Sequence, residues 1–340
     1  MTKREVVIDA LEFRPPAYVP WAWDMTQQCA ERARQHLGLD DLSGFIGSHI
    51  LPLGSAIGRF EKVGDDKFRD LYGVVWDRSV DKDIGTPVDW PIREPADLDA
   101  YEWPDAANFE WYEDIPRQLA ANRDLFSCYQ IGFSLYERAW TMRGMTDLLM
   151  EMVQRPEFVE RLMDAIVEHD LVQVHKAVSF DVDAVYFGDD YGMQTGLIMG
   201  IDHWRHFIKP RLARMFAPVR EAGKYVFLHS CGCVAELFDD LIEIGLSCFN
   251  PFQPEVMDVL AVKERYHGRL AFHGGMSVQK VLPFGTPEEV RRAARSLLDA
   301  GSEGGYIFSP SHSVPRDVPP ENLVAMMEVV RGQPGLTGGN

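Results

Sequence analysis

The sequence predicts an α/β protein with a (β/α)8 TIM barrel and a β-hairpin inserted in the N-terminal third. From about residue 124 onward, short apolar runs alternate with segments of helical periodicity, which indicates parallel strands connected through helices. The runs are continuously apolar, as expected for strands covered on both faces. No glycine-rich nucleotide-binding loop follows any of them, which disfavours an open dinucleotide-binding or P-loop sheet.

The expected elements follow in chain order. The first strand is predicted at residues 18–26 (YVPWAWDMT), and residues 44–95 interrupt the alternation as the inserted hairpin. Six further strands are expected at residues 126–132, 184–190, 225–231, 247–253, 270–275 and 306–312. With one or two more strands the count reaches about eight, which favours a closed barrel. A helix is predicted from Pro287 to Gly301, with Thr286 as its N-cap.

Composition narrows the class of protein. The 340 residues carry a formal net charge of −18, which argues against nucleic-acid binding, because that requires a basic face. The N-terminus lacks a secretory signal and no apolar stretch is long enough for a bilayer, so no membrane association is expected. Five scattered cysteines do not form a disulfide framework, and a cytoplasmic location is predicted. Residues 1–335 are expected to form one domain, followed by a flexible tail at 336–340.

Reactive side chains lie at the ends of the predicted strands, where a barrel of this kind builds its active site. They are Asp24, Asp189, Asp190, His229, Cys231, Cys233, Gln253, His273 and His312.

A metal site is one interpretation of this set. His229 and Cys231 are two residues apart on an extended segment, so their side chains point the same way, and Zn²⁺ accepts both ligand types. His312 is the preferred third ligand because it ends the last strand, and Cys233 is the competing one. The alternative is that His229 is a hydrogen-bonded barrel residue and Cys231 a buried thiol.

The other candidates concern the substrate. Adjacent carboxylates at a strand end point to opposite sides, so one of Asp189 and Asp190 faces the cavity and the other caps a turn. Asp189 is expected to orient a substrate amine or hydroxyl, or to support the metal. His273 is a candidate for ligand contact, with a solvated loop histidine as the alternative. A substrate pocket is expected to involve Trp21, Trp23, Asp24, Phe187, Asp190 and Gln253.

The motifs FLHSCG, NPFQPE, FHGGMSVQKVLPFGTPEEV and GGYIFSPSHSVPRDVPPENL resemble the uroporphyrinogen decarboxylase superfamily, especially its corrinoid-dependent methyltransferases such as the methylcobamide:coenzyme M enzymes. The resemblance implies a (β/α)8 barrel and a zinc ion held by His-x-Cys and a later Cys. His229 and Cys231 match the first two positions. His312 stands at the third, which makes the site less anionic and suits an acceptor other than the coenzyme M thiol.

The function implied by this resemblance is zinc-dependent methyl transfer between a small methylated substrate, an O-methyl or N-methyl compound, and a corrinoid (cobalamin) cofactor. The Asp-x-His-x-x-Gly corrinoid signature is missing, so the corrinoid is expected on a partner protein. Asp189 and His273 are the expected catalytic residues, and a homodimer is one assembly left open. Two alternatives remain. A decarboxylase-like lyase acting on a tetrapyrrole is disfavoured because Arg14 is the single Arg in the stretch FRPPAYVPWAWDMT, where that family has an Arg-rich motif. The other alternative is a non-catalytic barrel that binds a tetrapyrrole or metabolite.

Overall fold

The main sheet contains seven strands, and every neighbouring pair is parallel. The computed structural model describes residues 1–55 and 59–336. The strands lie in the order β1 (Ile50–Ser55), β6 (Phe126–Ile131), β7 (Ala184–Gly188), β10 (Tyr225–His229), β11 (Cys248–Phe252), β12 (Ala271–Met276) and β13 (Tyr306–Pro310). The last six coincide with the apolar runs, so the prediction of parallel strands at these positions is confirmed.

Residues 20–22 connect the two edges of this sheet. The amide of Ala22 donates to the carbonyl of Phe308 in β13 at 3.2 Å, and the amide of Phe308 donates to the carbonyl of Pro20 at 2.8 Å. On the other side, the amide of His49, the residue before β1, donates to the carbonyl of Trp21 at 2.9 Å. The sheet therefore curls until its edges meet, and the carboxyl ends of its strands surround a common space.

The first predicted strand is thus present only as isolated bridges, from Trp21 to Phe308 and from Met25 to Val314. One of the residues in 18–26, Pro20, explains this outcome in part. Pro20 has no amide hydrogen to donate, and a proline cannot take part in a regular central ladder. Residues 20–22 therefore fill the position of a barrel strand, but they form isolated bridges instead of a continuous ladder.

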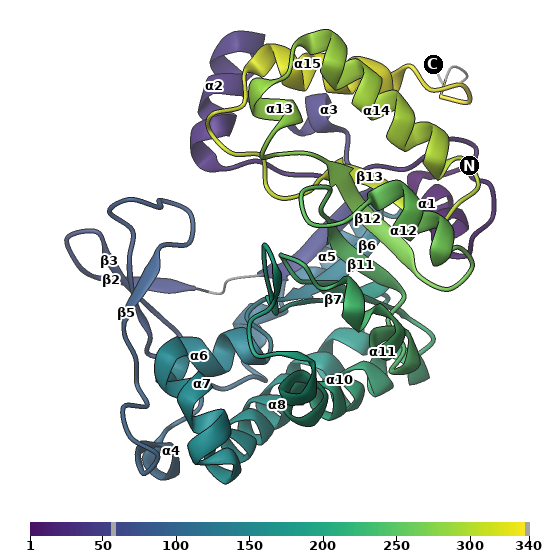
Figure 1. The fold of residues 1–340 in the computed structure, drawn as a ribbon. Coiled ribbons are helices and arrows are strands. Elements are labelled where there is room, and N and C mark those ends of the chain that lie inside the picture. Colours follow the sequence, from purple (N-terminus) through teal and green to yellow (C-terminus); the bar gives the residue numbers. More distant parts are fainter. Residues whose placement is uncertain (56–58, 337–340) are drawn as a thin grey trace.

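The hairpin predicted at residues 44–95 is not confirmed. Within this range β1 belongs to the main sheet, and the rest forms a four-stranded antiparallel sheet of β2 (Phe60–Gly64), β3 (Lys67–Asp70), β4 (Val75–Asp77) and β5 (Thr86–Asp89). Residues 56–58 lie outside the described residues. The sequence pattern did not predict β1, because Pro52 and Gly54 interrupt its apolar run. The inserted sheet stands beside α6 and α7, away from the main sheet (Figure 1).

Helices cover the outside of the main sheet. Figure 1 shows α6, α7, α8 and α10 on one side and α2, α13, α14 and α15 on the opposite side. The helices are α1 (Lys3–Leu11), α2 (Gln27–Leu37), α3 (Ser43–Ile46), α4 (Asp97–Ala100), α5 (Ile115–Ala121), α6 (Tyr136–Arg143), α7 (Met145–Gln154), α8 (Pro156–Val178), α9 (Ile201–His203), α10 (Lys209–Glu221), α11 (Phe238–Glu243), α12 (Val259–Arg265), α13 (Val281–Phe284), α14 (Pro287–Gly301) and α15 (Pro320–Arg331). The set is completed by two short 3₁₀ helices, η1 (Phe109–Trp111) and η3 (Ala235–Leu237), and by a π-helical segment, η2 (Trp204–Ile208). A small ladder joins β8 (Gly192–Met193) to β9 (Gly196–Leu197).

The helix predicted after Thr286 is confirmed as α14. The Thr286 hydroxyl accepts a hydrogen bond from the Glu289 amide at 3.3 Å, and the Glu289 carboxylate accepts one from the Thr286 amide at 2.7 Å. This reciprocal pair satisfies two amides that a helix start leaves without partners. The cap fixes where the helix between β12 and β13 begins.

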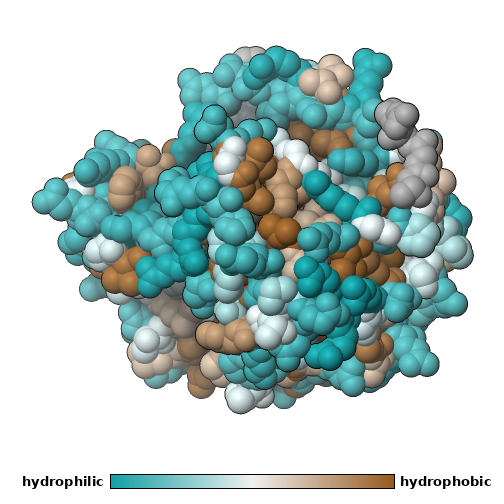
Figure 2. Space-filling view, turned by 90° about the horizontal axis from the view of Figure 1, so that it is seen from above, coloured by the Kyte–Doolittle hydropathy of each residue, from teal (hydrophilic) through white to brown (hydrophobic). Residues whose placement is uncertain are grey.

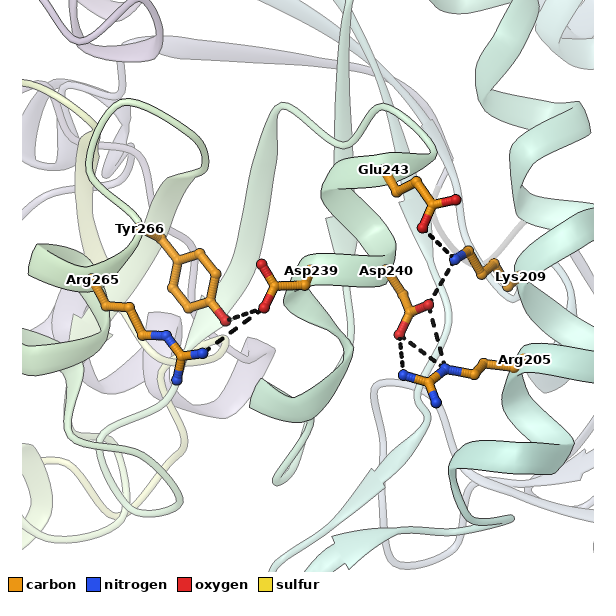
Figure 3. A network of polar contacts seen from close by, with 7 residues as sticks. All are labelled: Arg205, Lys209, Asp239, Asp240, Glu243, Arg265 and Tyr266. Atoms are coloured by element: carbon orange, nitrogen blue, oxygen red, sulfur yellow. Dashed lines mark hydrogen bonds and ion pairs between the residues drawn. The ribbon is translucent and has the colours of Figure 1, made fainter.

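Ion pairs fix α11, which follows the loop after β10 (Figure 3). Asp240 accepts from Lys209 Nζ at 2.6 Å and from Arg205 Nη2 at 2.9 Å, which ties α11 to α10 and η2. On its other side, Asp239 accepts from the hydroxyl of Tyr266, just past α12, at 3.3 Å. Partly buried pairs such as Lys209–Asp240 contribute more than fully exposed ones. The network holds the far end of the loop that contains Cys231.

The surface and the core have the expected composition for a folded domain. The face seen in Figure 2 is mostly hydrophilic, with hydrophobic residues in smaller groups, and the inserted sheet projects at its left. Trp76 of the inserted sheet and Phe133 beside β6 belong to the same buried hydrophobic cluster.

No helix of the described residues is both long and apolar enough to cross a membrane. The five cysteines are free thiols.

Candidate metal centre

A cavity of about 370 Å³ opens at the carboxyl ends of the main-sheet strands. The polar side chains along its wall include Asp24, Glu137, Asp190, His229, His273 and His312. They come from the ends of different strands and from the segments that follow them. The cavity therefore gathers residues that lie far apart in the sequence, as the barrel prediction required.

Three potential metal ligands meet at this cavity. His229 is the last residue of β10, Cys231 follows it by two, and His312 lies just past β13. One ligand atom from each lies within 4.8 Å of the other two, and His229 Nε2 is 3.4 Å from Cys231 Sγ. The rings of His229 and His312 are 5.8 Å apart between centroids. The structure thus brings together the three residues predicted as metal ligands.

Cys233, the competing candidate, does not belong to this group. The chain turns at Gly232, whose φ of +88° is in the region that favours glycine. A Cβ at Gly232 would lie 2.4 Å from the carbonyl carbon of Gly192, so the turn also needs glycine for space. Beyond the turn, the amide of Cys233 donates to the carbonyl of Met193 at 2.7 Å. The turn ends the alternation that would have kept the two thiols on one side.

Asn250 of β11 orients the imidazole of His229. The Asn250 amide nitrogen donates to the carbonyl of His273 at 3.0 Å, so its oxygen faces His229. That oxygen is 2.6 Å from His229 Nδ1 and also accepts from the Tyr186 hydroxyl at 2.9 Å. His229 Nδ1 must therefore hold the proton, and the lone pair on Nε2 is directed toward Cys231. This arrangement of a histidine and its outer partner is typical of metal sites.

The donor set fits a zinc ion. Two nitrogens and one sulfur are ligands that zinc takes in tetrahedral sites with one open position. Tetrahedral geometry at normal bond lengths separates a nitrogen and a sulfur ligand by roughly 3.5 Å, and His229 Nε2 and Cys231 Sγ are 3.4 Å apart. Burial, with the carboxylates of Asp190 and Glu137 nearby, raises the pKa of the Cys231 thiol well above its usual range. A bound cation would reverse this effect by stabilising the thiolate.

The adjacent carboxylates Asp189 and Asp190 do point to opposite sides. Asp189 is fully buried and does not line the cavity. It accepts hydrogen bonds from the amides of Tyr136 and Glu137 at 2.9 and 2.6 Å and from the Tyr191 hydroxyl at 2.7 Å. Burial nonetheless raises the pKa of Asp189 to about 7. Its contacts place it at the first turn of α6, which is the capping role expected for its neighbour.

Asp190 is the member of the pair that faces the cavity. Its Oδ1 accepts from the amide of Cys231 at 2.7 Å and lies 3.6 Å from His229 Nε2. It therefore supports the loop of the metal ligands and contributes negative charge beside them.

Glu137 is a cavity residue that the sequence reasoning missed. It lies in the first turn of α6, and its side chain lines the cavity. Burial and the neighbouring carboxylates of Asp190 and Asp189 raise the pKa of Glu137 well above its usual range. No motif or spacing pointed to it. The one available signal was its position shortly after the predicted strand at 126–132, where barrel active sites gather residues.

The remaining candidates divide between the cavity and its surroundings. Trp23, Asp24 and His273 line the cavity, whereas Phe187 and Gln253 do not. His273 Nε2 is 2.8 Å from the carbonyl oxygen of Ala22, and its Nδ1 has no hydrogen-bond partner in the described structure. Burial lowers the pKa of His273 to about 4, so its imidazole is neutral at pH 7.

Gln253 and Trp21 have supporting positions. The Gln253 side-chain oxygen accepts from the amide of Gly232 at 3.2 Å and so steadies the turn after Cys231. Trp21 Nε1 donates to the carbonyl of Ile46 at 2.8 Å. Phe187 is fully buried and packs against Phe216 of α10, with 5.1 Å between ring centroids.

Comparison with known proteins identifies relatives of two activities. The uroporphyrinogen decarboxylase (URO-D) family matches residues 79–333. The chain is 22% identical to uroporphyrinogen decarboxylase of Chlorobaculum tepidum over 71% of this chain and 70% of the relative. It is 21% identical to methylated-thiol–coenzyme M methyltransferase of Methanosarcina mazei over 82% of this chain and 76% of that protein.

The fold has a counterpart among solved structures. A methyltransferase from Methanosarcina mazei superposes with a TM-score of 0.68 and 15% identity, over 97% of this chain and 98% of that one. At this identity the likeness concerns the fold, which agrees with the curled parallel sheet described above. Because the family match extends over most of the chain and includes all three candidate metal ligands, the chain belongs to the uroporphyrinogen decarboxylase family.

Proposed function

We propose that this protein is a zinc-dependent methyltransferase that moves a methyl group between a small methylated substrate and a corrinoid carried by a partner protein. The observation that carries the proposal is the convergence of His229, Cys231 and His312, whose ligand atoms lie within 4.8 Å of one another. His229 and His312 also line the cavity. The methyltransferase among the relatives also supports the assignment of this chain as a methyltransferase.

Each residue of the candidate site would have its own role in binding the metal or the substrate. His229, Cys231 and His312 would hold the ion, and Asn250 would keep Nε2 of His229 available through the 2.6 Å contact to Nδ1. When bound, zinc would supply Lewis acidity that activates a thiol, ether or hydroxyl group. Asp190 would hold the ligand loop through the amide of Cys231. The cavity would enclose the methylated group and limit its contact with water.

Decarboxylation of a porphyrinogen is less well supported. That substrate bears several carboxylates, and binding them needs basic side chains, above all Arg. Among the described residues that line the cavity, none is Lys or Arg. The carboxylate and imidazole groups that line it include those of Asp24, Asp190 and His312. Such a wall would repel a polyanion.

Elemental analysis of the purified protein tests the proposal. We expect about one zinc per chain in the wild type, lost in Cys231→Ala and in His312→Ala. Cys233→Ala is the matched control, since it removes a neighbouring thiol outside the ligand group, and it should retain the metal. Wild-type protein without metal after purification in the absence of chelators would overturn the proposal.

A zinc-loaded protein then needs an activity assay. When the protein is mixed with a reduced corrinoid and an O-methyl or N-methyl compound, we expect methylated corrinoid to form. The change in the visible spectrum of the corrinoid measures this reaction. The same spectrum should stay constant with Cys231→Ala. Tight binding of the methyl compound without any transfer would favour the non-catalytic alternative.

A further inference from the structure

The charge of the cavity is uniformly negative apart from its histidines. Asp24, Glu137 and Asp190 all line it, and no described lining residue is Lys or Arg. Asp24 is exposed, and Glu137 and Asp190 are partly buried, where a carboxylate attracts a nearby cation more strongly than it does in bulk water. These three are described with no Lys or Arg at an ion-pair distance in the structure. A cation that enters the cavity would therefore meet carboxylates that no Lys or Arg of the described residues neutralises.

A zinc ion would satisfy only part of this demand. The three carboxylates, together with the Cys231 thiolate that zinc requires, bring four negative charges against the two positive charges of the ion. The metal-loaded cavity thus has a formal charge of minus two, or minus one if Glu137 keeps a proton. The metal alone therefore leaves the cavity negative.

Aromatic side chains supply a second, independent feature. Trp23, Phe133 and Tyr186 line the same cavity, and Trp23 and Phe133 are at least nine-tenths buried. The indole nitrogen of Trp23 has no hydrogen-bond partner in the described structure. Aromatic faces attract cations, above all quaternary ammonium groups, and the attraction increases where water is excluded. A cavity of about 370 Å³ suits a small molecule.

From these features we infer that the cavity binds a small methylated ammonium compound as its substrate and rejects sulfonates and carboxylates. This inference rests on the proposed function, because the ammonium compound would be the methyl-bearing substrate. Glu137 and Asp190 would face the positive charge from the side of α6 and β7, and Trp23 and Phe133 would contact its methyl groups. The anionic coenzyme M would be excluded by the same carboxylates.

Isothermal titration calorimetry on the full-length protein of measured zinc content tests the inference. The probes are choline, its neutral isostere 3,3-dimethyl-1-butanol, and 2-mercaptoethanesulfonate. We expect choline to bind about tenfold or more tightly than the alcohol, and no detectable binding of the sulfonate. Equal affinity for choline and the alcohol, or tighter binding of the sulfonate, would overturn the inference.

Substitutions test whether the preference for choline over the alcohol arises in the cavity. Glu137→Gln and Asp190→Asn should each lower the preference for choline over the alcohol, while circular dichroism shows unchanged folding. Glu113→Gln removes an exposed carboxylate that does not line the cavity, so it is the control for net charge and should leave the preference unchanged. If the control lowers it equally, long-range charge and not the cavity is responsible.

The two proposals can fail separately. A protein without zinc that still prefers choline would contradict the metal-dependent function and support the cation site. A zinc-containing protein that transfers methyl groups from neutral ethers, with no preference for choline, would support the function and overturn the cation site.

Discussion

At the scale of single residues, Asn250 links more of the candidate site than any predicted ligand does. Its side-chain oxygen accepts hydrogen bonds from Nδ1 of His229 and from the hydroxyl of Tyr186, and its side-chain nitrogen donates one to the carbonyl of His273. It is buried, so loss of its side chain would leave these groups without their hydrogen-bond partner. The position of one amide therefore determines the tautomer of a candidate metal ligand.

Replacement of Asn250 tests this role. Asn250→Ala should lower zinc affinity by about 10- to 100-fold, as for other outer partners of metal ligands. Competition with a chromophoric chelator measures the affinity. Tyr186→Phe is the control: it removes the 2.9 Å bond to the same oxygen and leaves the acceptor for His229, so its effect should be smaller. Unchanged affinity in Asn250→Ala would contradict the assignment.

His49 gives a prediction for pH. Its imidazole is fully buried between the carbonyl of Trp21 and the hydroxyl of Tyr18, each at 3.1 Å from a ring nitrogen. Burial, with Lys3 adding repulsion, lowers its pKa from the ordinary 6.5 to about 3. The unfolded chain therefore binds a proton in a range where the folded chain does not, and stability is lost as the pH falls from 6.5 toward 3.

The size of this effect follows from the shift. Between pH 7 and pH 5, His49 should cost about 2 kcal/mol of unfolding free energy. His49→Gln keeps groups that can bond to both neighbours but does not titrate, so its loss of stability over this range should be smaller by that amount. Urea denaturation at the two pH values gives the comparison. An identical pH dependence in both proteins would rule His49 out as the source.

At the scale of elements, a buried ion pair connects the inserted sheet to the main body. Arg138 of α6 pairs with Asp70, the last residue of β3, at 3.0 Å, and both side chains are almost fully buried. Its guanidinium also lies 3.7 Å from the ring centre of Tyr72. Because the neighbouring residue Glu137 faces the cavity, this pair also fixes the wall of the site.

Loss of one partner should be costly. Arg138→Met leaves Asp70 buried without its cation, and we expect about 3–5 kcal/mol less stability. Denaturant midpoints measure the loss. The double variant with Asp70→Asn should lose less than the sum of the two single variants, since neither charge remains. Additive losses would mean that the two side chains do not depend on each other.

The same elements show what a sequence can and cannot predict. Strands such as β7 and β10 were predictable because burial on both faces requires an unbroken apolar run. β1 was not, since Pro52 and Gly54 interrupt its run and its partner β6 lies far along the chain. The proximity of His229, Cys231 and His312 was predictable from alternation and strand ends. Glu137 was not, because its place in the cavity depends on how α6 is set against β7, and that is a matter of tertiary packing.

At the scale of the whole molecule, the inserted sheet and the main sheet share one hydrophobic core. The rings of Trp76 in β4 and Phe133 beside β6 have centroids 5.3 Å apart, and both side chains belong to the large buried cluster. A shared core joins the free energies of the two parts, so neither is expected to open alone.

Hydrogen exchange across a urea series tests this expectation. Amides of residues 67–77 in the inserted sheet and of 225–229 in β10 should lose protection at the same urea concentration. Mass spectrometry of the corresponding peptides measures both in one sample. Earlier exposure of residues 67–77 would show that the insertion is a separate unit and that the single domain expected at residues 1–335 is wrong.

The meeting of the sheet edges at residues 20–22 also has a consequence for synthesis on the ribosome. The bridge from Trp21 to Phe308 joins segments from opposite ends of the chain, and a contact of such long range closes late. Trp23 and Asp24 are synthesised long before His312, and all three line one cavity. A nascent chain can therefore form local helices and turns long before it has a cavity to close. An interrupted translation product would have most of the helices and strands but no place to bind a metal or a substrate.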